Sequence, residues 1–247
     1  DGRWFYRVDG YPASEVNIRS MTSGTYSIIN DLEGGKVIGS VESARAFHTV
    51  HPGAIYLHRG EAFRVVELDQ ENYRAHVVPT DATHYTEPND TTTISVISQQ
   101  KSKPFGVTTV YFGDVVVSNQ VLGYRCKQLY SDTILDMVDV DLPEQIFETE
   151  ALWFTVPIAV VRELAENGLD LAGAIHAVEH AMIGMMPIVT TCDRWDIGGV
   201  SSLGHFDTGM ATIFIYDGYP GGIGLTESTY ERIETLSERT LELIQGC

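Results

Sequence analysis

Cysteine and lysine are both scarce in this 247-residue sequence, which contains three cysteines and four lysines. The cysteines Cys126, Cys192 and Cys247 are odd in number and far apart, which excludes a disulfide-stabilised secreted scaffold. They predict instead a chain that stays in the reducing cytoplasm. The sequence also lacks a Walker A loop and an Asp-Glu-x-His box, so we predict no ATPase centre within these residues.

Long uninterrupted apolar runs are absent as well. The longest apolar segment is interrupted by His176, Glu179, His180 and Pro187. A membrane span needs about 20 consecutive apolar residues, so we predict no membrane partner. The sequence begins at Asp1 without an initiator methionine, and we expect it to be a piece of a longer polypeptide.

Negative charge dominates the composition, since 34 acidic and 16 basic residues give a formal net charge of −18. Phosphate contacts require clustered lysine and arginine, so the net charge by itself argues against a nucleic-acid partner. However, residues 1–156 hold 12 of the basic residues against 21 acids, whereas residues 157–247 hold 4 against 13. Only the first part can form a basic patch. We interpret the overall acidity as adaptation to high salt, which screens such charge.

Short β-rich runs separated by turns occupy the sequence up to residue 156 and predict an antiparallel β-barrel or sandwich. Candidate strands cover residues 15–19, 26–29, 36–38, 54–57, 63–67, 76–78, 94–98, 107–112, 114–118, 122–129 and 151–156. Residues 59–61 predict a hairpin turn containing glycine. Residues 41–49 predict a short helix with Ser40 as its cap, and the polar residues 80–92 predict a loop.

After residue 157 the pattern is typical of a mixed α/β module. Predicted elements are a helix over 158–167 that stops at Gly168, a buried apolar helix over 171–186, a buried strand over 211–216 and a long amphipathic helix over 226–244, whose inner face carries Ile233, Leu236, Leu241 and Ile244. We therefore predict an α+β protein. Its barrel-like module covers residues 20–156 and its α/β module residues 157–247, with the boundary near Val156.

The segment His176-x-x-Glu179-His180 has the spacing of an inverted zincin motif. In that motif two histidines one helical turn apart bind zinc, and the glutamate acts as the base. A zinc-dependent hydrolase is therefore one functional hypothesis, although the sequence identifies neither a third ligand nor an open metal position. The alternative is a buried polar network in which Glu179 pairs with a histidine or with Arg194.

A Gly-rich turn precedes the predicted C-terminal helix. It comprises Asp217, Gly218, Tyr219, Pro220, Gly221 and Gly222, with Gly224 shortly after. Glycines let backbone N–H groups face outward at a helix N-terminus, where they can bind an anion. We predict phosphate contact here, in particular with a nucleic-acid backbone, and a capping role for Asp217. The alternative is a tight strand-to-helix connection without a ligand.

Cys192 is followed by Asp193, Arg194, Trp195 and Asp196. Neighbouring carboxylates disfavour a thiolate, so we predict a structural rather than a reactive cysteine. Arg194 and Asp196 are predicted to form an internal ion pair.

Histidines, arginines and aromatic residues are interleaved between residues 45 and 64. The set consists of His48, His51 and His58, Arg45, Arg59 and Arg64, and Phe47, Tyr56 and Phe63. Such interleaving is typical of a strand-borne nucleic-acid surface. The alternative is an ordinary solvated face of the barrel.

Five segments taken together resemble one protein family. They are HPGAIYLHRGE at residues 51–61, ETEALW at 148–153, HAVEHA at 176–181, CDRWDIGG at 192–199 and YDGYPGG at 216–222. In this order they resemble the C-terminal region of the mitomycin-repair-type DEAD/DEAH-box DNA helicases of superfamily 2, relatives of the fungal RecQ4-like helicases. The resemblance covers nearly the whole chain.

The resemblance implies that two RecA-like motor domains precede this region in the parent protein. These domains hydrolyse ATP with Mg²⁺, move 3′ to 5′ along DNA and act in DNA repair. Residues 1–19 are then similar to the tail of a winged-helix or connecting segment, and the remainder is similar to an accessory, zinc-binding region. In the family a four-cysteine zinc cluster begins where Cys247 stands, so these residues supply one ligand of an incomplete site and hold no cofactor of their own.

We therefore predict an accessory nucleic-acid-binding region of an ATP-dependent 3′–5′ DNA helicase that guides single-stranded or forked DNA beside the motor domains. The Gly-rich turn is the predicted contact. His176, Glu179, His180, Arg194 and Asp196 are assigned to a polar network that shapes it. The alternatives are the zinc-dependent hydrolase and a protein-interaction scaffold without DNA affinity.

Overall fold

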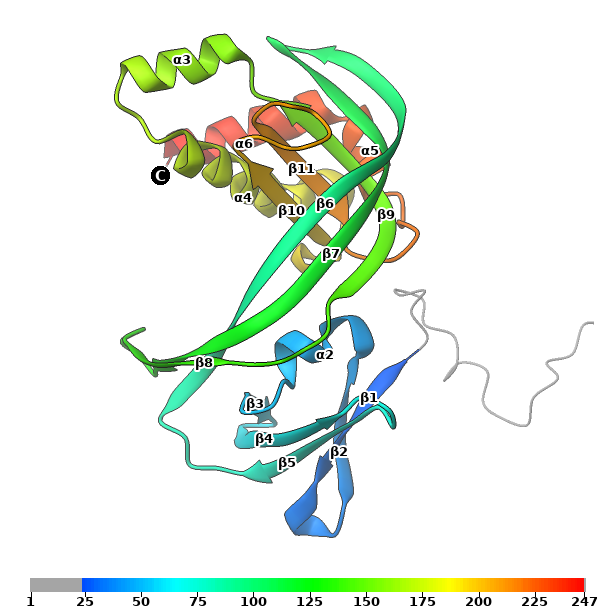
Figure 1. Cartoon of the computed structure of the whole chain (residues 1–247), viewed down its shortest axis with the longest axis vertical. Coiled ribbons are helices and arrows are strands. Elements are labelled where there is room, and N and C mark those ends of the chain that lie inside the picture. Colours follow the sequence, from blue (N-terminus) through cyan, green and yellow to red (C-terminus); the bar gives the residue numbers. More distant parts are fainter. Residues whose placement is uncertain (1–23, 247) are drawn as a thin grey trace, which may run out of the picture.

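The protein contains two sheets and a layer of helices, and its computed structural model describes residues 24–246. The predicted strand at 15–19, the predicted tail at 1–19 and Cys247 lie outside the described residues. Figure 1 shows the first sheet with one short helix at one end of the molecule and the remaining helices at the other, with two long strands running between them. The predicted α+β class is confirmed.

The N-terminal sheet has five strands in the order β2-β1-β5-β4-β3. Its elements are β1 (Thr25–Asn30), η1 (Asp31–Glu33), β2 (Lys36–Glu42), α2 (Ser43–Thr49), β3 (Ile55–His58), β4 (Glu61–Asp69) and β5 (Arg74–Pro79). All pairs are antiparallel except β1 with β5. The sheet curls until its two edge strands approach each other. A Cβ at Gly39 of β2 would lie only 3.2 Å from the Tyr56 hydroxyl of β3, the opposite edge strand.

The sequence predicted a hairpin turn and a helix cap in this part of the chain, and only the turn is confirmed. The predicted hairpin at residues 59–61 joins β3 to β4, with Arg59 at φ 50° and Gly60 at φ 87°. Two successive positive φ values match the twist of the flanking strands. The predicted cap Ser40 is wrong, because β2 continues to Glu42 and α2 begins at Ser43.

The C-terminal sheet has the order β10-β11-β9-β7-β6, and β8 pairs with β7. Its strands are β6 (His84–Phe105), β7 (Thr108–Gln128), β8 (Ile134–Asp139), β9 (Gln145–Thr155), β10 (Ile197–Ser202) and β11 (Thr212–Asp217). The predicted loop at 80–92 is wrong, since β6 begins at His84. Residues 84–92 pair with residues 119–128 of β7, and threonine fits a strand exposed to solvent.

The predicted boundary at Val156 falls inside this sheet. β9 precedes the boundary and β11 follows it, yet Trp153 pairs with Phe214 in antiparallel register. The core of the N-terminal sheet likewise includes Val121 and Leu142 from the β7–β9 segment. The strands on either side of residue 156 therefore share hydrogen bonds, and Trp153 and Phe214 also lie in one buried cluster.

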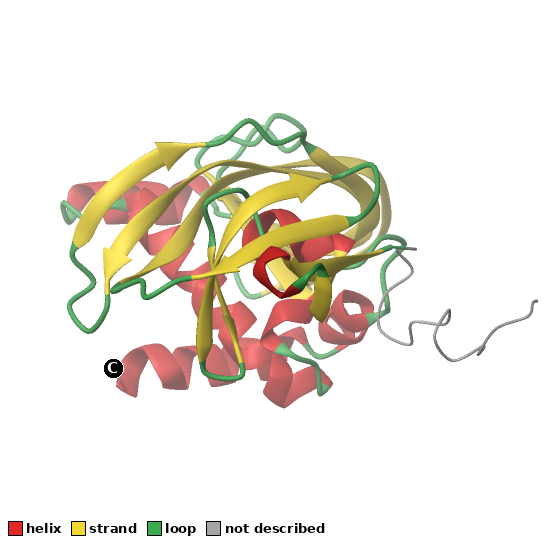
Figure 2. Ribbon diagram, turned by 90° about the horizontal axis from the view of Figure 1, so that it is seen from below, coloured by secondary structure: helices red, strands yellow, loops and turns green. Residues whose placement is uncertain are grey.

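Four helices accompany the C-terminal sheet: two of them pack on one of its faces and the other two pack on those helices. In Figure 2 most of the helices lie along the lower side of the strands. The four helices are α3 (Ile158–Glu166), α4 (Leu171–Thr190), α5 (Leu225–Glu231) and α6 (Ile233–Gly246). The single C-terminal helix predicted over 226–244 is wrong, because the backbone leaves helical geometry at Arg232. Ile233 and Leu236 are buried as predicted, but Leu241 and Ile244 are exposed.

The helix α4 is buried on one face only, so the prediction of an entirely buried helix is wrong. Its buried face packs on β10, β11 and α6, whereas Ile188 on the opposite face is 69% exposed. By length and composition alone α4 could cross a membrane. Here its apolar residues contribute to the largest core cluster, which lies between the helices and the sheet.

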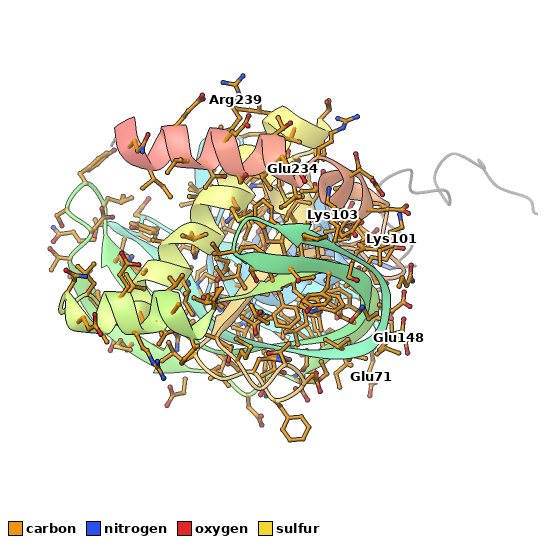
Figure 3. The ribbon with its side chains drawn as sticks, turned by 90° about the horizontal axis from the view of Figure 1, so that it is seen from above. Glu71, Lys101, Lys103, Glu148, Glu234 and Arg239 are labelled. Atoms are coloured by element: carbon orange, nitrogen blue, oxygen red, sulfur yellow. The ribbon has the colours of Figure 1, made fainter. Side chains whose placement is uncertain are left out.

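Ion pairs connect β6 to the helices. Figure 3 shows Lys103 beside Glu234, with Lys101 near Lys103. Lys101 Nζ lies 2.8 Å from Glu227 and 3.1 Å from Glu231, and Lys103 Nζ lies 3.2 Å from Glu234. Two of the four lysines are therefore neutralised by acids of α5 and α6.

Candidate functional site

The turn between β11 and α5 is organised by the carboxylate of Asp217, which is 0% exposed. Its Oδ2 accepts hydrogen bonds from the backbone N–H groups of Ile223 at 2.7 Å and Leu225 at 3.1 Å, and its Oδ1 accepts one from Thr226 at 2.8 Å. A buried carboxylate is tolerated because charge-assisted bonds replace its hydration. Asp217 thus holds the turn against the first residues of α5.

Three glycine amides of the turn are also occupied. Gly218 donates to the Asp196 carbonyl, Gly221 to the Glu148 carbonyl and Gly222 to the Tyr219 carbonyl. The predicted phosphate site relied on outward-facing N–H groups, and these three together with the three bound by Asp217 all point inward. These six donors are therefore not free for a phosphate, and phosphate contact at this turn stays a prediction.

Carboxylates surround the same turn. A Cβ at Gly222, where φ is 71°, would lie 2.7 Å from Glu150 Oε2, so glycine makes room for this acid. Burial raises the pKa of Glu150, and the carboxylates of Asp217, Glu227 and Asp114 raise it further. A field of this sign repels a second anion.

Tyr219 connects the turn to the segment after α4, where a 3₁₀ turn η2 covers Arg194–Asp196. The Tyr219 hydroxyl donates to Asp196 Oδ1 at 2.9 Å, while Asp196 Oδ2 accepts the Asp193 N–H at 2.8 Å. The guanidinium of Arg194 lies over the Trp195 ring instead. The predicted Arg194–Asp196 ion pair is therefore wrong, because Asp196 bonds to a hydroxyl and an amide.

Cys192 lines a pocket of about 440 Å³ beside the turn, together with Pro187, Thr191, Asp193, Asp196, Ile223 and Leu225. Burial raises the pKa of the Cys192 thiol, and the Asp196 and Asp193 carboxylates also raise it. The thiolate is disfavoured, which agrees with a structural cysteine.

His176, Glu179 and His180 lie together where α4 faces β10. His176 Nδ1 is 3.3 Å from Glu179 Oε2, and the two imidazole rings meet edge to face with centroids 4.4 Å apart. Of the predicted partners of Glu179, the structure selects a histidine rather than Arg194. Sequence reasoning missed the contribution of β10, where Ser201 Oγ lies 3.3 Å from His176 Nδ1.

The mixed basic and aromatic set at residues 45–64 is divided by the fold. His51, Phe47 and Phe63 are buried in the core of the N-terminal sheet. Arg59 and Arg64 are exposed, and within residues 24–246 neither forms an ion pair. The predicted surface is therefore reduced to exposed cations, because Phe47 and Phe63 point inward. These cations are Arg59 and Arg64 on the β3–β4 hairpin and Arg45 on α2, whose guanidinium lies over the Trp195 ring.

Comparison with known proteins identifies similar chains. Residues 178–247 match the family described as the MrfA Zn-binding domain. The uncharacterized ATP-dependent helicase YprA of Bacillus subtilis (strain 168) is 30% identical over 249 residues, covering 99% of this chain and 33% of YprA. The ATP-dependent helicase hrq1 of Schizosaccharomyces pombe is 29% identical over 252 residues, covering 96% of this chain and 23% of hrq1.

Among solved structures, the DUF1998 helicase MrfA bound to DNA has a TM-score of 0.63 at 27% identity. That alignment covers 97% of this chain and 32% of MrfA. The chain thus spans a third or less of the length of these relatives.

Proposed function

Because the chain belongs to the family formed by the C-terminal regions of the helicases YprA, Hrq1 and MrfA, we propose that it is an accessory DNA-binding region of an ATP-dependent 3′–5′ DNA helicase. The observation that carries the proposal is similarity along nearly the entire chain to a helicase whose structure was solved with DNA. In the parent, motor domains would bind ATP and Mg²⁺. This region would guide the single or forked strand, in the cytoplasm and without a membrane.

Zinc is implied by the family's name, and the described residues fit it through imidazole and carboxylate donors. Cys126 and Cys192 belong to no group of three candidate ligands in residues 24–246, whereas His176, Glu179 and His180 form such a group. The incomplete cysteine site at Cys247 stays a prediction from the resemblance.

Within this chain, two arginines of the β3–β4 hairpin are the candidates for DNA contact, because both are exposed and neither forms an ion pair within residues 24–246. Six backbone amides between residues 218 and 226 already donate within the protein, and the carboxylates around the turn make its field negative. Arg59 and Arg64 offer guanidinium groups that bind phosphate in a planar, two-pronged geometry. They support DNA contact through the N-terminal sheet, with Tyr219 as a further candidate near the turn.

Titration with a fluorescently labelled single strand at several salt concentrations tests the proposal. Affinity should fall as salt rises, because phosphate contacts release counterions. The double variant R59Q/R64Q should bind more weakly, and its slope of log affinity against log salt should be shallower by about 1.4 if both residues contact phosphate.

The matched control is K36Q/R239Q, which also removes two cations but takes them from the ion pairs with Glu33 and Glu242. It should leave the slope unchanged. A folded chain that does not bind DNA, or an equal loss in both variants, would reject the arginine contact. The absence of binding at every salt concentration would favour the protein-interaction scaffold.

A further inference from the structure

We infer that His176, Glu179 and His180 form a binding site for one divalent transition-metal ion, with zinc as the best chemical match. Two imidazoles and one carboxylate are a ligand set that zinc uses in proteins. This inference goes beyond the DNA-binding role and does not rest on it. The site is also distinct from any cysteine cluster that includes Cys247.

The distances between the donor atoms fit such an ion. One donor atom from each of the three residues lies within 4.8 Å of the other two. Tetrahedral zinc with bonds of about 2.0–2.1 Å separates its ligands by about 3.3 Å, which is the 3.3 Å found between His176 Nδ1 and Glu179 Oε2. The His180 donor, which lies within 4.8 Å of the other two, would move closer to them to reach the same centre.

The burial of Glu179 gives an independent reason for a cation. Its side chain is only 6% exposed, and in residues 24–246 its one ion-pair partner is His176, whose side chain is 63% exposed. A buried carboxylate is normally matched by a charged partner or by a metal ion. The exposed imidazole of His176 alone compensates the buried negative charge of Glu179 only in part.

The neighbouring strand β10 is shaped to accept this carboxylate. A Cβ at Gly199 would lie 2.7 Å from Glu179 Oε1 and 2.6 Å from Ile183 Cδ1. Glycine at this position therefore leaves the space that the Glu179 side chain fills. The carboxylate is held in place by packing before any ion arrives, which reduces the conformational entropy lost on binding.

Solvent reaches the site from the histidine side. His176 and His180 are both exposed, so an ion can enter without an opening of the core. Three protein ligands leave a fourth position of a tetrahedral ion for water, and Ser201 Oγ borders that side. The site is thus an open one.

Cobalt(II) titration of the metal-free chain is the experiment that tests this inference. Cobalt(II) substitutes for zinc, and its visible absorption reports tetrahedral coordination, whereas a near-ultraviolet charge-transfer band reports thiolate ligands. We expect one equivalent to bind with the visible band and without the thiolate band. Competition with zinc should then displace the cobalt.

Two variants identify the ligands, and two others serve as controls. His176→Ala and His180→Ala remove exposed side chains, so circular dichroism should show an intact fold, and each should weaken binding at least about tenfold. His84→Ala, at the start of β6, is the histidine control and should bind like the native chain. Cys247→Ser should also be unaffected.

Two results would overturn the inference. One is the absence of stoichiometric cobalt binding by the folded native chain. The other is binding that survives His176→Ala and His180→Ala but disappears, together with a thiolate band, on Cys247→Ser. Neither result depends on DNA affinity, so the metal site and the DNA-binding proposal can fail separately.

Discussion

Asp217 shows how one buried side chain determines a local backbone conformation. Three N–H groups of the following segment converge on its carboxylate, and Thr149 Oγ donates to the Asp217 carbonyl at 2.9 Å. The end of β11, the start of α5 and the neighbouring strand β9 are thereby joined through one residue. Removing the carboxylate would leave several buried donors unpaired.

The variant Asp217→Ala should lower the free energy of unfolding by about 3–5 kcal/mol, because an unpaired buried donor costs about 1–3 kcal/mol. Urea unfolding followed by circular dichroism measures this change. Glu238→Ala removes an exposed acid from α6 and should change stability by less than about 0.5 kcal/mol. Equal, small effects of the two substitutions would contradict the assigned role of Asp217.

His51 is a second residue with a predictable effect. It is 0% exposed, its ring lies 4.7 Å from that of Tyr124, and burial lowers its pKa below the usual 6.5. Below pH 6.5 the His51 side chain therefore binds a proton more readily in the unfolded chain than in the native chain. The stability attributable to neutral His51 is complete above pH 6.5 and is lost as the pH falls toward the native pKa.

Replacing His51 by asparagine should make stability less dependent on pH. The difference in slope should approach about 1.4 kcal/mol per pH unit, the value for one proton. Urea unfolding at a series of pH values from about 8 to 5.5 gives both slopes. The control His58→Asn removes a histidine that remains partly exposed, and an unchanged slope in His51→Asn would refute the prediction.

At the scale of elements, α4 depends on its N-terminal cap as well as on its buried face. Asp170 accepts hydrogen bonds from the N–H groups of Ala172 and Gly173, each at 3.0 Å. The helix has Pro187 in its last turn, and Arg232 donates to the Val189 carbonyl there. Its two ends are therefore stabilised by different means, by a local carboxylate and by a distant guanidinium.

Asp170→Ala should destabilise the protein by about 1 kcal/mol, the usual loss for an N-cap. Hydrogen exchange should be faster in the first turn of α4 and unchanged in β11. Asp170→Ser preserves a side-chain acceptor at the cap and should restore most of the protection. Faster exchange throughout the sheet would indicate that the cap does more than stabilise one turn.

At the scale of the whole molecule, the two sheets are joined by continuous strands and by shared burial. Val121 of β7 packs in the core of the N-terminal sheet, while Phe112 of the same strand packs beneath the helices. The chain also carries a formal net charge of −18. Self-repulsion of this charge opposes the compact state, and salt reduces it.

Thermal unfolding should therefore shift to higher temperature between about 0.1 and 1 M sodium chloride, where the screening length falls from about 10 to 3 Å. DNA affinity should change in the opposite direction over the same range. Scanning calorimetry and the strand titration measure the two trends on one preparation. A melting temperature that stays constant or falls with salt would argue against adaptation to high salt.

The sequence determined the α+β class, the β3–β4 hairpin, the buried strand β11 and the position of α4, because each depends on local periodicity or turn chemistry. Only the tertiary structure decided that residues 84–92 form a strand, since their polar sequence has no apolar period and β7 supplies the pairing. Tertiary contacts also left His176 and His180 in solvent and occupied the amides at residues 218, 221 and 222. The carbonyls that accept two of those amides belong to Asp196 and Glu148, which are distant in sequence, and hydrogen bonds of that range cannot be inferred from spacing along the chain.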